Sequence, residues 1–218
     1  AVIGATGSGK TTLVGLIPRF YDATDGEVLI DGVNVKDYTF DALYDRLGYV
    51  TQKAVLFAGT VQDNVFFGES AVPETDEALS DALSLSQAAE FVGKYPEGAE
   101  HPIAQLGRNV SGGQKQRLSI ARALARKPEI LVFDDSFSAL DYRTDAALRE
   151  GLAKELPDTT KVIVAQRIST IRHADQILVL DRGAAVGLGT HDELMRSCDV
   201  YREIALSQLS AAELAEGG

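Results

Sequence analysis

A glycine-rich segment near the start of the chain has the residue types and spacing of a phosphate-binding loop. Residues 4–11, which read GATGSGKT, match the pattern G-x-x-x-x-G-K-[ST] at every fixed position, between an apolar stretch and a predicted helix. Glycines let consecutive backbone N–H groups turn toward phosphate oxygens, where side chains would collide. The N-terminus of the following helix points its positive end at the same place. We therefore expect this segment, the phosphate loop, to bind a nucleotide.

Two adjacent carboxylates follow an apolar run in the segment ILVFDD, which ends at Asp134 and Asp135. A Mg²⁺ ion bound to phosphates needs a carboxylate, usually at the end of a neighbouring hydrophobic strand, and Asp134 stands at that point. The phosphate loop itself supplies Lys10 for the β- and γ-phosphates and the Thr11 hydroxyl for the metal. The sequence therefore predicts a site for a nucleoside triphosphate and Mg²⁺.

A second glycine turn opens a predicted helix in the segment NVSGGQKQR, which ends at Arg117. Ser111 can cap this helix through its hydroxyl. Gly112 and Gly113 leave the first N–H groups bare, which makes a second phosphate-binding surface. Arg117 and Arg122 are expected to form salt bridges on this helix rather than to contact nucleotide.

With two further stretches, the chain resembles the nucleotide-binding domain of ABC transporters over essentially its whole length. YVTQ, which ends at Gln52, is similar to the family's Q-loop, and SALD at 138–141 is similar to its D-loop. The chain differs from the family's L-S-G-G-Q signature at Val110, where the family usually has Leu. The resemblance implies an α/β P-loop NTPase core with a mostly parallel sheet and a helical signature subdomain. It also implies ATP and Mg²⁺ as cofactors, each ATP lying between one subunit's phosphate loop and the partner's signature.

The resemblance assigns roles to individual residues. The nucleotide-binding set is Gly4, Ala5, Thr6, Gly7, Ser8, Gly9, Lys10, Thr11, Thr12 and Gln52. The signature set, which contacts the partner's ATP, is Ser111, Gly112, Gly113 and Gln114, and the D-loop set is Ser138, Ala139, Leu140 and Asp141. The metal set is Thr11, Gln52 and Asp134, and the catalytic set is Asp135 and Gln166.

Two residues depart from the pattern of hydrolytically competent family members. The family usually has Glu after the metal aspartate, to polarise the attacking water, whereas the arm of Asp135 is one methylene, roughly 1.3–1.5 Å, shorter. An error of about 1 Å can cost on the order of a hundredfold in rate. Gln166 stands where the family usually has a switch histidine, and its amide can donate to a γ-phosphate oxygen but cannot carry a positive charge. Both changes together resemble the degenerate-site half of a heterodimeric exporter, whose own site cleaves ATP slowly.

The segments LIPRFYDATDGEVLIDGVNV and LFAGTVQDNVFFG resemble exporter-type domains of the multidrug or lipid kind. The expected partners are a second, non-identical nucleotide-binding domain and the coupling helices of a transmembrane domain, at the cytoplasmic face of the cell membrane. Phe57, Phe66 and Phe67 either contact those helices or belong to the core. The alternatives are a homodimer that hydrolyses ATP through Asp135, an importer subunit, and a soluble ABC ATPase acting on nucleic acid or ribosomes.

The composition agrees with one α/β domain and disfavours nucleic-acid binding. A chain of 218 residues, 45% of them hydrophobic, suffices for one domain with a core, or for a domain with a small subdomain. Its net charge of −11 leaves no basic stripe of the kind that binds nucleic acid. No apolar run approaches the ~20 residues that span a bilayer. One cysteine excludes an internal disulfide, and the histidines are not spaced as a metal site.

Alternating strands and helices must position these motifs. Strands are predicted at 26–30, 48–50, 129–133, 161–165, 175–180 and 184–188, and helices at 10–17, 39–45, 73–95, 111–126 and 142–156, with a further helix capped by Thr190 and Glu193. This order implies parallel strands with right-handed crossovers. We divide 1–218 into a RecA-like core (1–55 and 128–190), a helical subdomain (about 56–127) and C-terminal helices (191–218). The family's N-terminal antiparallel strands are expected to be missing before Ala1, and the tail AAELAEGG is expected to be a frayed helix end.

Overall fold

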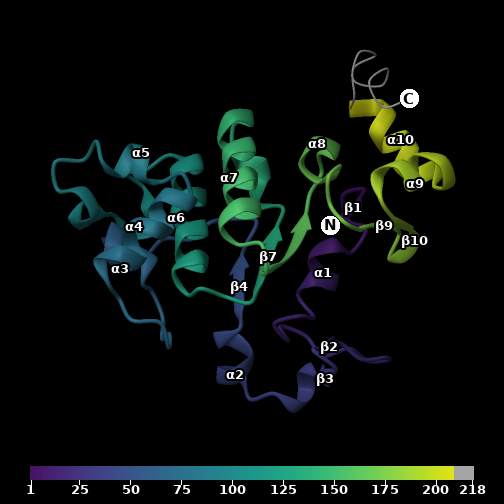
Figure 1. Cartoon of the computed structure of the whole chain (residues 1–218), viewed down its shortest axis with the longest axis horizontal. Helices are drawn as coiled ribbons and strands as arrows, with labels where there is room; N and C mark the ends of the chain where they lie inside the picture. Colours follow the sequence, from purple (N-terminus) through teal and green to yellow (C-terminus); the bar gives the residue numbers. More distant parts are fainter. Residues whose placement is uncertain (209–218) are drawn as a thin grey trace.

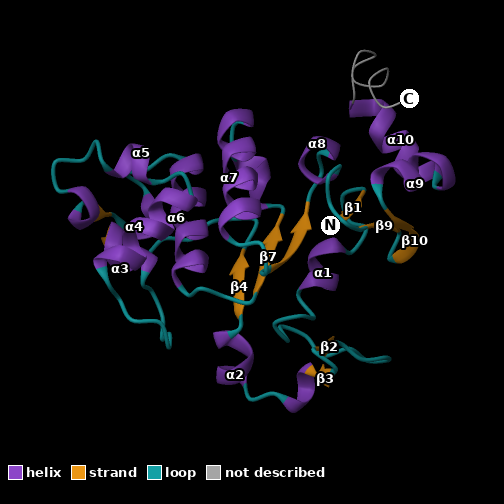
Figure 2. Ribbon diagram, viewed as in Figure 1, coloured by secondary structure: helices purple, strands orange, loops and turns teal. Residues whose placement is uncertain are grey.

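A six-stranded sheet forms the centre of the computed structural model, which describes residues 1–208. The strand order is β10-β9-β1-β8-β7-β4, and all neighbours are parallel except β10, which pairs antiparallel with β9. The strands are β1 (Val2–Gly4), β4 (Leu47–Val50), β7 (Ile130–Asp134), β8 (Thr160–Val164), β9 (Ile177–Asp181) and β10 (Ala184–Gly189). The prediction of an α/β fold with a mostly parallel sheet is confirmed (Figures 1 and 2).

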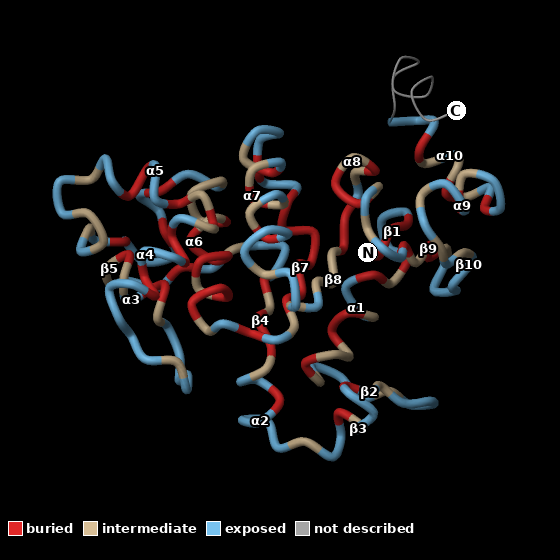
Figure 3. The backbone as a smooth tube through the Cα atoms, viewed as in Figure 1, coloured by how far each residue is buried: buried red, intermediate tan, exposed pale blue. Residues whose placement is uncertain are grey.

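Both faces of the sheet are covered by helices, as the apolar strands require. Neighbouring residues of β1 show this, because Val2 packs in one apolar cluster with Val14 and Ile3 packs in another with Ile168 and Tyr201. The helices that follow these strands are α1 (Lys10–Val14), α7 (Tyr142–Glu155), α8 (Ile168–Ile171), α9 (His191–Ser197) and α10 (Asp199–Gln208). Figure 3 shows that the buried residues run through the strands and the helix faces turned toward them.

A group of helices beyond β4 forms its own apolar cluster, to the left in Figure 1. It contains α3 (Val61–Val65), α4 (Asp76–Leu85), α5 (Ala89–Val92) and α6 (Gly112–Ala125), with the small sheet of β5 (Gly59–Thr60) and β6 (Pro102–Ile103). Short 3₁₀ helices lie at Val35–Asp37, Gly98–Glu100, Gln105–Gly107 and Ser136–Ala139. The cluster also includes Val50 of β4 and Leu131 and Phe133 of β7, so it packs directly against the sheet.

The structure corrects two element predictions. The strand predicted at 26–30 is only β2 (Leu29–Ile30), which pairs with β3 (Val33–Asn34), and α2 (Phe40–Asp45) follows as predicted. The helix predicted at 10–17 ends at Val14, because the N–H groups of Leu16 and Ile17 bond three residues back instead of four. The tail AAELAEGG lies outside the described residues. Within residues 1–208, no helix is both long and apolar enough to cross a membrane.

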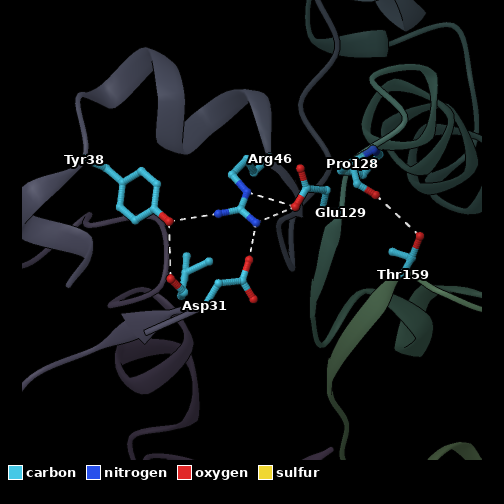
Figure 4. Close-up of polar contacts among 7 residues, drawn as sticks. Asp31, Tyr38, Arg46, Pro128, Glu129 and Thr159 are labelled. Carbon is cyan, nitrogen blue, oxygen red and sulfur yellow. Dashed lines mark hydrogen bonds and ion pairs between the residues drawn. The ribbon is translucent and has the colours of Figure 1, made fainter. Parts of the chain in front are cut away.

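Arg46 joins two parts of the chain that are far apart in the sequence, residues 31–46 and Glu129 (Figure 4). It follows the last residue of α2, and its guanidinium donates to the Tyr38 hydroxyl at 2.8 Å, to Glu129 through Nε at 2.9 Å, and to Asp31. Its carbonyl accepts from the N–H groups of Glu129 and Ile130, both at 3.0 Å. Arg46 therefore ties the β2–β3 turn and α2 to the start of β7, the strand that ends at the paired aspartates.

We expect Arg46→Ala to lower the free energy of unfolding by about 1–2 kcal/mol, because several hydrogen bonds of one half-buried guanidinium are lost together. Urea denaturation followed by circular dichroism measures the change. The control is Arg182→Ala, whose side chain is 91% exposed and pairs only with its neighbour Asp181, and we expect no measurable change there. Equal stability of the two variants would contradict the role of Arg46.

Candidate functional site

The phosphate loop connects the end of β1 to the start of α1, as predicted. Gly4 is required by close packing, since a Cβ at this position would lie 2.1 Å from the Leu180 carbonyl oxygen. Gly9 precedes α1 with a φ of 97°, a left-handed conformation that favours glycine. Among residues 1–208, the Ser8 hydroxyl is one of the buried polar groups that have no hydrogen-bond partner. A buried, unsatisfied donor in a glycine turn before a helix fits a phosphate group.

Lys10 places a buried cation inside this loop. Its Nζ donates to the carbonyl oxygens of Gly4 and Ala5, both at 2.8 Å. Burial lowers the pKa of the Lys10 amine, while the negative charges of Asp135 and Asp134 act in the opposite direction. The charges of both aspartates therefore act on the Lys10 ammonium group, and its contact with phosphate stays a prediction.

Asp134 meets Thr11 at the end of β7. The Thr11 hydroxyl donates to Asp134 Oδ1 at 2.9 Å, and the Tyr49 hydroxyl donates to Oδ2 at 3.3 Å. Burial, followed by the charge of Asp134, raises the pKa of Tyr49. The sequence analysis missed Tyr49, although it is the first residue of the YVTQ stretch that ends at Gln52.

The oxygen donors of this pair suit Mg²⁺. Thr11 and Asp134 supply a hydroxyl and a carboxylate, which are hard ligands. In the part of the chain that the structure describes, no group of three or more His, Cys, Asp or Glu side chains could hold a metal ion. At nucleotide sites Mg²⁺ usually binds one or two protein side chains and takes other ligands from phosphate oxygens and water, so a pair such as Thr11 and Asp134 suits it.

Asp135 is held by two amides that come from distant parts of the chain. Gln52 Nε2 donates to Asp135 Oδ2 at 2.9 Å, and Gln166 Nε2 donates to the same oxygen at 2.6 Å. The backbone of Asp135 is left-handed, with a φ of 50°, and its N–H donates to the Val164 carbonyl. The structure therefore brings the two predicted catalytic residues together. It places Gln52 on Asp135 rather than on the Thr11–Asp134 pair, so the metal role of Gln52 stays a prediction.

This arrangement limits what Asp135 can do chemically. A carboxylate oxygen has two lone-pair sites, and the two amide N–H groups occupy those of Oδ2. Neither amide can accept a proton from the aspartate or carry charge. The cluster of Gln52, Asp135 and Gln166, here called the amide clasp, is therefore suited to holding three segments in place and poorly suited to activating water through Oδ2.

The predicted second phosphate-binding surface corresponds to the start of α6. Ser111 Oγ accepts from the N–H of Gln114 at 3.3 Å, and Gln114 Oε1 accepts from the N–H of Ser111 at 2.8 Å. The predicted serine cap is confirmed. The reciprocal bond from Gln114 was missed, although S-x-x-Q at 111–114 is a capping-box pattern. Ser111 and Gly112 are exposed, so this end of α6 is open to a partner.

The predicted salt bridges of Arg117 and Arg122 are wrong. Arg117 donates to the Gln87 carbonyl at 2.9 Å. Arg122 donates to the Asn64 carbonyl at 2.7 Å, to the Asn64 side chain at 3.1 Å and to the Val55 carbonyl at 3.0 Å. Both guanidinium groups satisfy backbone oxygens, because the helix and loop ends packed against α6 leave carbonyls without intrahelical partners.

The D-loop residues link the amide clasp to α7. The Ser138 hydroxyl donates to the Asp135 carbonyl at 2.7 Å. Asp141 caps α7 by accepting from the N–H of Thr144 at 3.0 Å and from its hydroxyl at 2.8 Å. These hydrogen bonds hold the pKa of Asp141 below its usual value. The contact of Asp141 with a partner's site stays a prediction.

Two of the three aromatic residues after the Q-loop form an exposed pair. Phe57 and Phe67 stack with their ring centroids 4.0 Å apart and are 41% and 48% exposed, whereas Phe66 packs against the core. The Arg122 guanidinium lies 5.5 and 5.4 Å from the two exposed rings. Beside them is a groove of about 720 Å³, lined in part by Phe20, Tyr44, Tyr49, Phe67, Arg122 and Arg126.

Comparison with known proteins gives a consistent set of relatives. A family model described as ABC transporter matches residues 1–138. An uncharacterized ABC transporter ATP-binding protein of Mycobacterium bovis is 46% identical over 215 residues, which is 97% of this chain and 36% of that protein. A putative multidrug export ATP-binding/permease protein of Staphylococcus aureus is 42% identical over 204 residues, 94% of this chain and 35% of that protein.

Among solved structures, a bacterial Atm1-family ABC exporter with ATP bound matches with a TM-score of 0.89 and 35% sequence identity. The match covers 94% of this chain and 36% of that chain. The chain therefore spans little more than a third of the length of these relatives.

Proposed function

The chain belongs to the ABC transporter family, and we propose that it is the ATP-binding domain of an ABC exporter. The observation that carries this proposal is the meeting of Lys10, Thr11 and Asp134 at the ends of β1 and β7. The export role is supported by the similarity to the putative multidrug export protein of Staphylococcus aureus and to an exporter with ATP bound. On this proposal the domain works at the cytoplasmic face of a membrane, next to a transmembrane domain.

The residues of the site divide the work of binding Mg-ATP. The N–H groups of the phosphate loop and the N-terminus of α1 hold the phosphate oxygens, and Lys10 adds a positive charge. Thr11 and Asp134 would hold a magnesium ion, which would supply positive charge to offset the charge of the phosphate oxygens. The exposed end of α6 at Ser111 contacts the nucleotide of a second nucleotide-binding domain.

We propose that this chain's own site hydrolyses ATP slowly and that its signature completes a competent site in a non-identical partner. The amide clasp supports this, because Oδ2 of Asp135 is already engaged by two amides. Gln166 cannot become charged as a histidine would. The second candidate is a homodimer that hydrolyses ATP at modest rate through Asp135, which the ionisable carboxylate favours. The soluble ABC ATPase acting on nucleic acid remains disfavoured by the acidic charge.

Coupling to the membrane is proposed to use the groove beside Phe67. Its apolar and aromatic lining suits the end of a helix from the transmembrane domain. Arg122 belongs to α6, and its guanidinium contacts both exposed rings. A displacement of Phe57 and Phe67 would therefore be transmitted to α6, the helix that begins at the signature. The division into a core (1–55 and 128–190), a helical subdomain (about 56–127) and a C-terminal part (191–218), whose described residues form α9 and α10, is proposed from the family resemblance and from the apolar cluster of the helical part.

Titration of the chain with a fluorescent ATP analogue, with and without Mg²⁺, tests nucleotide binding. We expect Mg²⁺ to strengthen binding, and Asp134→Asn to remove most of that gain, about tenfold, while Mg²⁺-free binding changes little. The control Asp81→Asn changes an exposed carboxylate of α4 and should bind like the unmodified chain. Two results would count against the proposed metal site: an affinity for the ATP analogue that does not change with Mg²⁺, or an Asp134→Asn variant whose affinity Mg²⁺ raises as much as that of the unmodified chain.

A further inference from the structure

The last residue of α10 contacts the backbone on both sides of Arg167. Gln208 Oε1 accepts a hydrogen bond from the N–H of Ile168 at 2.9 Å, and Gln208 Nε2 donates to the carbonyl oxygen of Gln166 at 2.7 Å. One side-chain amide therefore pairs with two backbone groups, as a neighbouring strand would. The contact spans 40 and 42 positions of the sequence and joins the end of α10 to the segment that carries Gln166.

The helix that follows Gln166 has no cap of its own. The residue before α8 is Arg167, and its side chain makes no capping hydrogen bond. By contrast, α6 and α9 are capped by the preceding Ser111 and Thr190. The first N–H groups of a helix need acceptors, and Gln208 supplies one for the first residue of α8.

The helix that presents Gln208 is firmly packed. Tyr201 and Ala205 of α10 are fully buried and share an apolar cluster with Ile168 and Ile171 of α8. The Tyr201 hydroxyl also contacts His191 Nδ1 at 2.8 Å. The backbone of Gln208 is therefore held in place, and only its side-chain torsions must be ordered for the amide to bond the neighbouring segment.

We propose that Gln208 is a positioning residue for Gln166. By fixing the Gln166 carbonyl, it directs the Gln166 side-chain amide toward Asp135 and, on the proposed function above, toward the γ-phosphate of bound ATP. Orientation matters more here than it would for a histidine, because Gln166 has no charge. A hydrogen bond from a neutral amide weakens steeply when its angle falls, whereas the attraction between two charges depends mainly on distance.

The test compares ATP and ADP binding, because Gln166 is proposed to contact the phosphate that ADP lacks. In the unmodified chain we expect Mg-ATP to bind more tightly than Mg-ADP. Gln208→Ala should weaken ATP binding by about threefold to tenfold, the size of one hydrogen bond, and leave ADP binding unchanged. Gln166→Ala should have the same effect, and the double variant should be no worse than either single variant. Gln208→Glu, which keeps an acceptor for Ile168 but loses the donor to Gln166, should resemble Gln208→Ala.

The matched control is Ser207→Ala, which changes the adjacent exposed residue, whose hydroxyl bonds only within α10. Thermal unfolding should show that all variants are folded. An unchanged preference for ATP in Gln208→Ala, an equal loss for both nucleotides, or additive effects of the two substitutions would each overturn the positioning role. A chain that fails to bind Mg-ATP at all would instead overturn the proposed function, and with it this inference.

Discussion

Replacing Lys10 with alanine is expected to weaken binding of Mg-ATP by about a hundredfold or more. The lysine is the buried cation of the phosphate loop, and its Nζ already lies in hydrogen-bond contact with the loop's own carbonyls. A charged hydrogen bond to phosphate is worth about 1.5–3 kcal/mol, and the loss is larger here because Lys10 also offsets the charges of Asp134 and Asp135, which would then repel the phosphates more strongly.

Isothermal titration of the folded variant with Mg-ATP measures this effect. Lys94→Ala is the matched control, since that lysine has a side chain 71% exposed and pairs only with Glu90 one helical turn away. It should bind ATP like the unmodified chain. If Lys10→Ala retains binding within about threefold, the phosphate loop is not the nucleotide site and the proposed function is wrong.

Replacing Asp135 with glutamate and Gln166 with histidine together is expected to raise the rate of ATP hydrolysis by about tenfold to a hundredfold. The longer glutamate moves the carboxylate out of the amide clasp toward the bound nucleotide, and histidine can carry the positive charge that glutamine lacks. Each single change should give less than the pair, because Gln166 and Asp135 share one hydrogen bond and their effects are coupled.

The rate of ATP hydrolysis is measured as steady-state phosphate release. It is compared between the chain alone and its mixture with a family domain that has Glu after the metal aspartate. The mixture should exceed the sum of its parts, because this chain's signature would complete the partner's site. Asp135→Asn is the control and should change the slow rate of the chain alone by less than about twofold if Asp135 does not activate water. A double variant no faster than the unmodified chain, together with an unmodified chain as fast as the mixture, would favour the homodimer.

Local patterns were enough to predict much of the fold and half of the site. The phosphate loop, the serine cap of α6 and the capping box at Thr190 each depend on residues within a few positions of one another, and all three form as predicted. The alternation of strands and helices likewise predicted the parallel sheet. Such signals are readable because the backbone groups that they satisfy are neighbours in the chain.

The side-chain contacts on which the chemistry of the site depends could not be predicted from local sequence patterns. Asp135 accepts from Gln52 and Gln166, which lie 83 and 31 positions away, and Tyr49 reaches Asp134 across 85 positions. The sequence could name Asp135 and Gln166 as departures from a family pattern, but it could not place both amides on one oxygen. That depends on the strand order β1-β8-β7-β4, which differs from the order along the chain.

The sequence by itself therefore determined which residues could bind Mg-ATP, because their types and spacing are local. Only the tertiary structure decided which of them meet, since a parallel sheet gathers the carboxyl ends of strands that are far apart in the sequence. It also decided that Arg122 meets carbonyls rather than carboxylates and that Gln208 caps the helix after Gln166. Both contacts satisfy backbone groups at the ends of other elements, whose positions no local pattern specifies.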